Sequence, residues 1–69
     1  MSDINKRVGD NIRKYRTEKG WTQEELADHA GLHRAYIGQI ERGEKNIGLK
    51  NLEIICDALG VKVTAVLGK

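Results

Sequence analysis

The sequence predicts a compact all-α fold of four or five helices, and three observations support that class. Apolar residues recur every three or four positions over most of the chain, as they do along one face of a helix. β-Branched residues never alternate regularly with polar ones, so strands are not expected. Prolines are absent, and a glycine follows each periodic stretch where a helix would end: Gly20, Gly31, Gly43 and Gly60. The 69 residues form one predicted domain, 1–69, with room for one small core.

The first predicted helix runs from about Ile4 to Lys19. Its apolar stripe has spacings of four, four and three residues: Ile4, Val8, Ile12 and Tyr15. Gly9 lies inside this helix and costs it about 1 kcal/mol relative to alanine. We therefore expect another segment to pack closely against the helix at Gly9.

The second predicted helix runs from about Gln23 to Ala30, and the third from about His33 to Arg42. Thr22 and Glu25 have the spacing of a capping box, in which each side chain bonds the backbone N–H of the other residue. Gly31 separates the two helices because a residue without a Cβ atom adopts positive φ freely.

The fourth predicted helix runs from about Leu49 to Leu59, and Val61 to Leu67 forms a short fifth helix or a turn. Cys56 is expected to be a small core residue rather than a nucleophile or a redox switch. It shares the apolar face of the fourth helix with four leucine and isoleucine residues: Leu49, Leu52, Ile55 and Leu59.

Composition argues against several classes of protein. No apolar run reaches the length of a membrane span, and the N-terminal stretch lacks the apolar core of a signal peptide. The single cysteine rules out an internal disulfide framework, so we expect a cytoplasmic protein. The net charge of +2 is weak evidence for a nucleic-acid partner.

Catalytic and metal-binding patterns are not recognisable. The sequence has no carboxylate pair, nucleophile–base set or phosphate-binding glycine loop, so we expect no enzyme, no cofactor and no small-molecule ligand. His29 and His33 are four residues apart, but Gly31 breaks the helix between them and no third ligand is near. A metal site is therefore not expected.

The stretch from about 22 to 43 meets the steric requirements of a helix-turn-helix. These are an apolar contact, a small residue where the helices meet, a turn residue that tolerates positive φ, an apolar plug and two apolar anchors. All stand at the required spacing: Leu26, Ala27, Gly31, Leu32, Ile37 and Ile40. The outer face of the second helix of the motif is then left free.

The chain resembles the phage-repressor/Cro-like (XRE) helix-turn-helix family over nearly its whole length, from about Val8 to Leu67. The resemblance is carried by QEELADHAGLHRAYIGQIERG, with IRKYRTEKGWT before it and LKNLEIICDALGV after it. It implies a lambda-repressor-like domain of five helices that binds operator DNA as a homodimer, with the third helix in the major groove. Members of this size resemble Cro proteins and the small controller proteins of restriction–modification systems.

The resemblance also implies roles for single residues. Gln23 would contact a phosphate, and Arg16 would pair with Glu41 to brace the first helix against the third. Base contacts would come from the front of the third helix: His33, Arg34, Ala35, Gly38 and Gln39. Side-chain chemistry adds four residues suited to phosphate contacts, which set register and add salt-dependent affinity: Tyr36, Arg42, Lys45 and Asn46.

Ile54 lies opposite the apolar face of the fourth helix and is a candidate for a contact between two copies of the chain. We expect a homodimer interface that joins it to three residues near the C-terminus: Val63, Val66 and Leu67. The predicted function is a sequence-specific transcriptional regulator on a pseudo-palindromic site in double-stranded DNA of the nucleoid. An antitoxin-like or other protein-interaction module built on the same helices remains the alternative.

Overall fold

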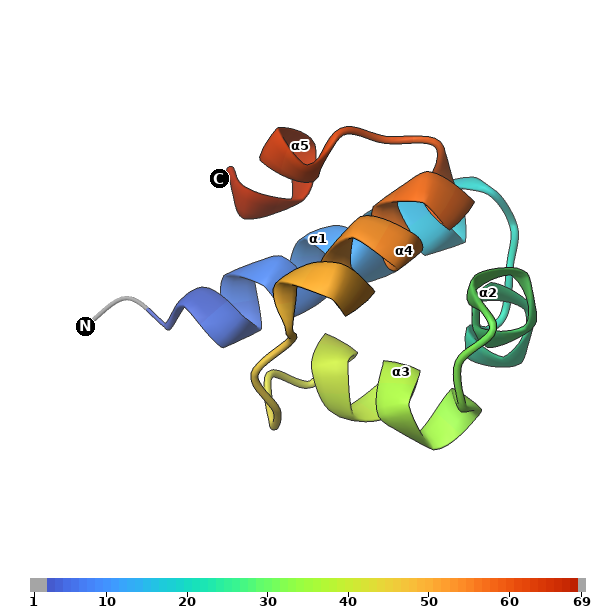
Figure 1. Cartoon of the computed structure of the whole chain (residues 1–69), viewed down its shortest axis with the longest axis horizontal. Helices are drawn as coiled ribbons and strands as arrows, with labels where there is room; N and C mark the ends of the chain where they lie inside the picture. The colour runs from blue at the N-terminus through green and yellow to red at the C-terminus, as the bar shows by residue number, and fades with distance from the viewer. Residues whose placement is uncertain (1–2, 69) are drawn as a thin grey trace.

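The computed structural model describes residues 3–68, which contain five helices and no strand (Figure 1). The predicted all-α class is therefore confirmed. The helices are α1 (Ile4–Glu18), α2 (Gln23–Ala30), α3 (Arg34–Glu41), α4 (Leu49–Leu59) and α5 (Val63–Leu67). Residues 1, 2 and 69 of the predicted domain lie outside the described residues. Within the described range, no helix has both the length and the apolar character needed to cross a bilayer.

The ends of the helices differ slightly from the predicted ones. His33 and Arg42, which we expected inside the third helix, are its N-cap and C-cap residues. The backbone of His33 is extended, and its side chain makes no capping hydrogen bond. The segment from Val61 to Leu67, predicted to be either a short helix or a turn, contains the helix α5.

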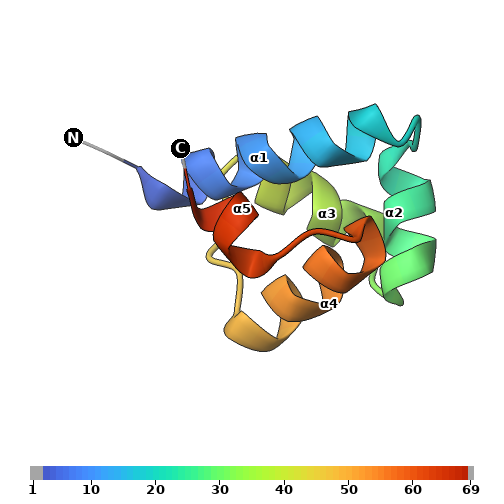
Figure 2. The same cartoon turned by 90° about the horizontal axis from the view of Figure 1, so that it is seen from above.

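The helices surround one small core, with α1 as the longest element. α1 packs against α3, α5 and α4, and α2 packs against α3 and α4. In Figure 1, α3 forms the lower edge of the molecule, α2 lies at its right end, and α5 lies at the top. Figure 2 shows α5 beside α1, and Figure 1 shows α5 above α1 and α3 below it. α3 is therefore covered from one side only.

The core draws apolar side chains from all five helices. Its buried members are Val8, Ile12, Leu26, Ala27, Ile37, Ile40, Leu52, Ile55, Cys56, Leu59 and Val66. Burial raises the pKa of the Cys56 thiol, which keeps it protonated at neutral pH. Leu49 was expected on this apolar face but is 83% exposed, because it is the first residue of α4 and extends past the end of the packed stripe. Ile4, the first residue of α1, is exposed in the same way.

At Gly9 the backbone of α1 lies close against the backbone of α3. A Cβ atom at this position would lie 2.3 Å from the carbonyl oxygen of Ile40 and 2.8 Å from that of Glu41. No side chain fits there, so the close packing expected at Gly9 is present. This contact sets the separation of α1 and the C-terminal end of α3.

We expect Gly9→Ala to lower the free energy of unfolding by about 1–3 kcal/mol, because the added methyl group would push α1 away from the α3 backbone. Urea denaturation would measure this as a lower midpoint with an unchanged m-value.

Gly38→Ala is the matched control, since Gly38 is also a helical glycine. A Cβ atom there would meet only the ends of flexible side chains, at 3.0 Å from Arg42 Nη1 and 3.4 Å from Gln23 Oε1. We expect this variant to be as stable as the parent or more stable, by up to about 1 kcal/mol of helix propensity. A Gly9→Ala variant as stable as Gly38→Ala would contradict the role given to Gly9.

Candidate nucleic-acid interface

The predicted motif from 22 to 43 folds as two helices joined at Gly31. The capping box that begins α2 is complete: Thr22 Oγ1 accepts from the Glu25 N–H at 3.1 Å, and Glu25 Oε1 accepts from the Thr22 N–H at 2.8 Å. Gly31 ends α2 with φ at 68°, and the Leu32 N–H returns to the Ala27 carbonyl oxygen at 2.9 Å. These local bonds fix both ends of α2.

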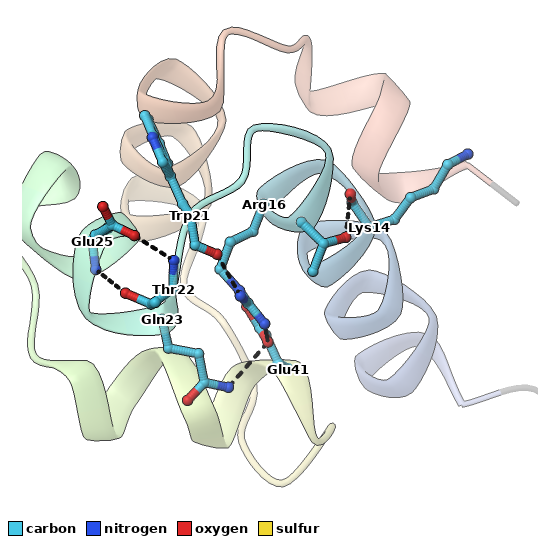
Figure 3. Close-up of polar contacts among 8 residues, drawn as sticks. Lys14, Arg16, Trp21, Thr22, Gln23, Glu25 and Glu41 are labelled. Carbon is cyan, nitrogen blue, oxygen red and sulfur yellow. Dashed lines mark hydrogen bonds and ion pairs between the residues drawn. The ribbon is translucent and has the colours of Figure 1, made fainter.

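A buried ion pair fixes α3 relative to α1. Arg16 Nε lies 2.7 Å from Glu41 Oε2, and Arg16 Nη2 lies 2.9 Å from Glu41 Oε1 (Figure 3). The two side chains are only 11% and 2% exposed. The pairing implied by the resemblance is thus present, and the hydrogen bond to Glu41 raises the pKa of Arg16 above its ordinary value.

The same pair is bonded to the start of α2. Arg16 Nη1 donates to the carbonyl oxygen of Trp21 at 2.7 Å, and Gln23 Nε2 donates to Glu41 Oε1 at 3.1 Å. Figure 3 shows these side chains meeting between α1, α2 and α3. The Gln23 amide, predicted to bind a phosphate, donates one of its two N–H groups to Glu41. Its second N–H can still donate to another acceptor.

The exposed front of α3 carries most of the residues predicted to contact bases. His33, Arg34 and Ala35 are exposed, and Gln39 is half-buried. Gly38 is buried, with the ends of the Gln23 and Arg42 side chains beside its Cα. The base contact of Gly38 stays a prediction, and it requires the flexible ends of these two side chains to move aside.

Three of the residues predicted to contact phosphates lie at or after the C-terminal end of α3, and a fourth, Tyr36, lies in its first turn. Arg42, Lys45 and Asn46 are exposed, and Tyr36 is half-buried. Tyr36 Oη accepts from Asn51 Nδ2 at 3.0 Å, and Lys45 Nζ lies 5.8 Å from the centre of the Tyr36 ring. The Tyr36 hydroxyl hydrogen remains available as a donor.

Glu44 and Asn5 belong to this surface, and the sequence analysis did not identify either of them. Glu44 makes two hydrogen bonds with Arg42, and this contact lowers the pKa of Glu44 below its ordinary value. Its position two residues after a predicted phosphate ligand was a signal in the sequence. Asn5 Nδ2 donates to Asn46 Oδ1 at 2.6 Å across 41 positions in sequence, and no sequence pattern indicates such a pair.

Residues predicted for a dimer interface divide into two groups. Leu67 is exposed, and Ile54 and Val63 are half-buried, so all three reach the surface. Val66 is fully buried and belongs to the core, which contradicts its predicted place in an interface. α5 packs against α1 and α4, and Val66 is its buried contribution to the core.

The two histidines serve no common site. The His29 ring stacks on Trp21 with ring centres 4.1 Å apart, while His33 occupies the N-cap position of α3 without a side-chain hydrogen bond to it. Residues 3–68 hold no cluster of three or more histidine, cysteine, aspartate or glutamate side chains arranged to bind a metal ion.

A braced helical hairpin with one polar face free has the form of a DNA-reading element, and comparison with known proteins assigns the family. The sequence profile of a family described as helix-turn-helix matches residues 12–66. The chain belongs to this helix-turn-helix family, of the phage-repressor/XRE type. Its homologues include DNA-binding transcriptional regulators and controller proteins.

Relatives of this helix-turn-helix chain include small controller proteins. It is 43% identical over 65 residues to the control protein C.SmaI of Serratia marcescens, covering 94% of this chain and 77% of that protein. Other relatives are longer, and the chain spans 54% and 43% of the length of two of them.

Solved structures of the helix-turn-helix family have the same fold. The restriction–modification controller protein C.AhdI from Aeromonas hydrophila matches with a TM-score of 0.87 and 37% identity, over 90% of this chain and 94% of that one. The biofilm regulator SinR, in a complex with DNA, matches with a TM-score of 0.85 and 37% identity, over 88% and 98%.

We expect Glu41→Gln to lower the free energy of unfolding by about 3 kcal/mol, because the buried Arg16 guanidinium would lose its counter-charge. Chemical denaturation measures the change. Asp10→Asn is the matched control, since it breaks the exposed Lys6–Asp10 pair, for which about 0–1 kcal/mol is expected. Equal losses in the two variants would contradict the bracing role of the Arg16–Glu41 pair.

Proposed function

We propose that the protein is a sequence-specific transcriptional regulator that binds a pseudo-palindromic operator as a homodimer, with α3 in the major groove. The observation that supports this most directly is the exposed N-terminal face of α3, held in place from behind by the buried Arg16–Glu41 pair. A recognition helix needs this combination of a free polar face and a fixed orientation. The kinship with controller proteins and with a regulator crystallised on DNA supports the same function.

The residues on the front of α3 suit direct readout of base edges. Arg34 has a planar fork of donors that matches the two acceptors of guanine, and Gln39 has the donor–acceptor pair that matches adenine. Ala35 offers a methyl group for contact with thymine. His33 lies one residue before α3 and adds a ring with a donor and an acceptor.

Phosphate contacts would fix the register of α3 in the groove. Arg42 is the C-cap residue of α3, Lys45 and Asn46 lie in the loop that follows, and all three are exposed. The second N–H of the Gln23 amide and the Tyr36 hydroxyl hydrogen can each donate to a phosphate oxygen. Such contacts add affinity for every sequence and make binding dependent on salt.

The two-fold contact would come from α4 and α5. Ile54, Val63 and Leu67 reach the surface on these helices, while the reading face lies on α3. A two-fold dimer duplicates α3, and the half-sites that it reads would then be about 34 Å apart, one turn of B-DNA.

We expect Arg34→Ala to keep its fold but to lose discrimination at one base pair, by about 1–3 kcal/mol. Selection of bound duplexes from random DNA would first give the operator, and titrations at fixed salt would then compare single-base variants of it. Unchanged base preference in Arg34→Ala would contradict the readout role.

Lys45→Ala is the comparison variant for this measurement. It should weaken binding to all duplexes alike and reduce the salt slope by about 1. Lys62→Ala, at the exposed N-cap of α5, serves as the control for loss of one positive charge elsewhere.

We expect Ile54→Glu to convert the homodimer to a monomer and to weaken operator binding, because a charge would be buried in the contact between two copies. Sedimentation equilibrium would follow the mass, and circular dichroism would verify the helices. Asp57→Ala changes an exposed residue of the same helix and should leave the mass unchanged. A mass unaltered by Ile54→Glu would remove Ile54 from the interface.

A further inference from the structure

We propose, on the basis of the function proposed above, that Glu44 is an intramolecular substitute for a DNA phosphate. It occupies the Arg42 guanidinium in the free protein and thereby lowers the affinity of the protein for DNA of any sequence. Glu44 is then a residue that limits binding rather than one that contributes to it.

The geometry of the pair is that of a guanidinium bound to an oxyanion. Arg42 Nε lies 2.8 Å from Glu44 Oε2, and Arg42 Nη2 lies 3.1 Å from Glu44 Oε1. Two parallel bonds to one edge of the guanidinium are also how arginine binds a phosphate group. Carboxylate and phosphate therefore compete for the same donors.

The backbone holds Glu44 close to Arg42 without help from other side chains. α3 ends in a tight turn, where the Gly43 N–H donates to the Ile40 carbonyl oxygen at 3.1 Å and the Glu44 N–H donates to the Gln39 carbonyl oxygen at 2.9 Å. Gly43 has φ at 73°, which favours glycine. This turn sets the two charged side chains next to each other in the free protein.

The guanidinium lies where the helices of the motif meet. Arg42 Nη1 is 3.0 Å from the site that a Cβ atom of Gly38 would occupy, and Gln23 Oε1 is 3.4 Å from the same site. Arg42 is thus positioned beside Gln23, at the start of α2, where the proposed function expects a phosphate. Arg42 Nη1 is the atom next to Gly38, while Nε and Nη2 of the same guanidinium are bonded to Glu44.

The Arg42–Glu44 pair is weak enough for a phosphate to replace the carboxylate. Both side chains are more than half exposed, at 56% and 55%, so water and salt screen their attraction. A phosphate that approaches the start of α2 can displace the Glu44 carboxylate from Arg42, but the negative charge of Glu44 then remains close to it. The opposing charge weakens every complex in which a phosphate reaches Arg42, which limits capture of the protein by the many non-specific sites of a genome.

The test is Glu44→Gln, measured by titration of a random-sequence duplex and of the selected operator across a range of salt concentrations. We expect tighter binding to both duplexes, by about 3- to 10-fold at low salt, and a salt slope steeper by about 1, as for one additional phosphate contact. The mechanism requires Arg42, so Glu44→Gln in an Arg42→Ala background should give a clearly smaller gain.

Glu53→Gln is the control for loss of one negative charge, because Glu53 is exposed on α4 and outside the proposed DNA contacts. Weaker or unchanged binding by Glu44→Gln would overturn the inference, and so would a gain equal to that of Glu53→Gln or equal with and without Arg42. In each of those cases the parent still binds DNA, so the proposed function stands. A parent protein that binds no duplex would overturn the proposed function and this inference with it.

Discussion

The buried pair of Arg16 and Glu41 is the interaction on which the rest of the structure depends. Two charges taken out of water are unfavourable unless every polar atom around them is bonded. Here the Trp21 carbonyl and the Gln23 amide supply the additional bonds, so α1, the entry to α2 and the end of α3 meet at one point. The contact at Gly9 brings the α1 backbone against the same end of α3. The position and angle of α3 are thus fixed on its inner side, by these bonds together with the packing of Ile37 and Ile40 in the core.

The outer surface of the motif, which we propose to bind DNA, is also constrained by bonds within the chain. Several groups that we assign to phosphates already have partners within the chain: Gln23 with Glu41, Tyr36 with Asn51, Arg42 with Glu44, and Asn46 with Asn5. Each partner constrains a side chain that would otherwise lose rotamer entropy on binding. The amide and hydroxyl partners leave a donor free, whereas the Glu44 carboxylate takes two donors and adds a charge. The pairs of Gln23, Tyr36 and Asn46 thus pre-organise the surface for phosphate binding. The Arg42–Glu44 pair opposes it.

Local patterns predicted the helices well, and longer-range geometry explains what they missed. The apolar period, the capping box at Thr22 and the glycine at Gly31 all act within one or two helical turns, so the sequence contains them in full. Leu49 and Val66 depend on where a helix ends relative to its neighbours and on which side of a short helix packs, and periodicity over five residues in α5 does not decide that. Periodicity did not predict the burial of Gly38, because the side chains that cover it come from Gln23 and Arg42, outside its own helical turn. The pair Arg16–Glu41 was accessible only through the family resemblance.

α1 connects the reading surface to the surface assigned to self-association. Gly9 contacts the end of α3, and Asn11, two residues on, donates to the Val66 carbonyl oxygen at 2.7 Å and to that of Gly68 at 2.6 Å. Residues two apart in a helix lie about 200° apart around its axis, nearly on opposite sides. α3 and α5 therefore contact opposite sides of α1. In a two-fold dimer formed through α4 and α5, the separation of the two reading helices would then be set by the width of α1 and its contacts. A change at Gly9 or Asn11 would alter that separation without touching either surface.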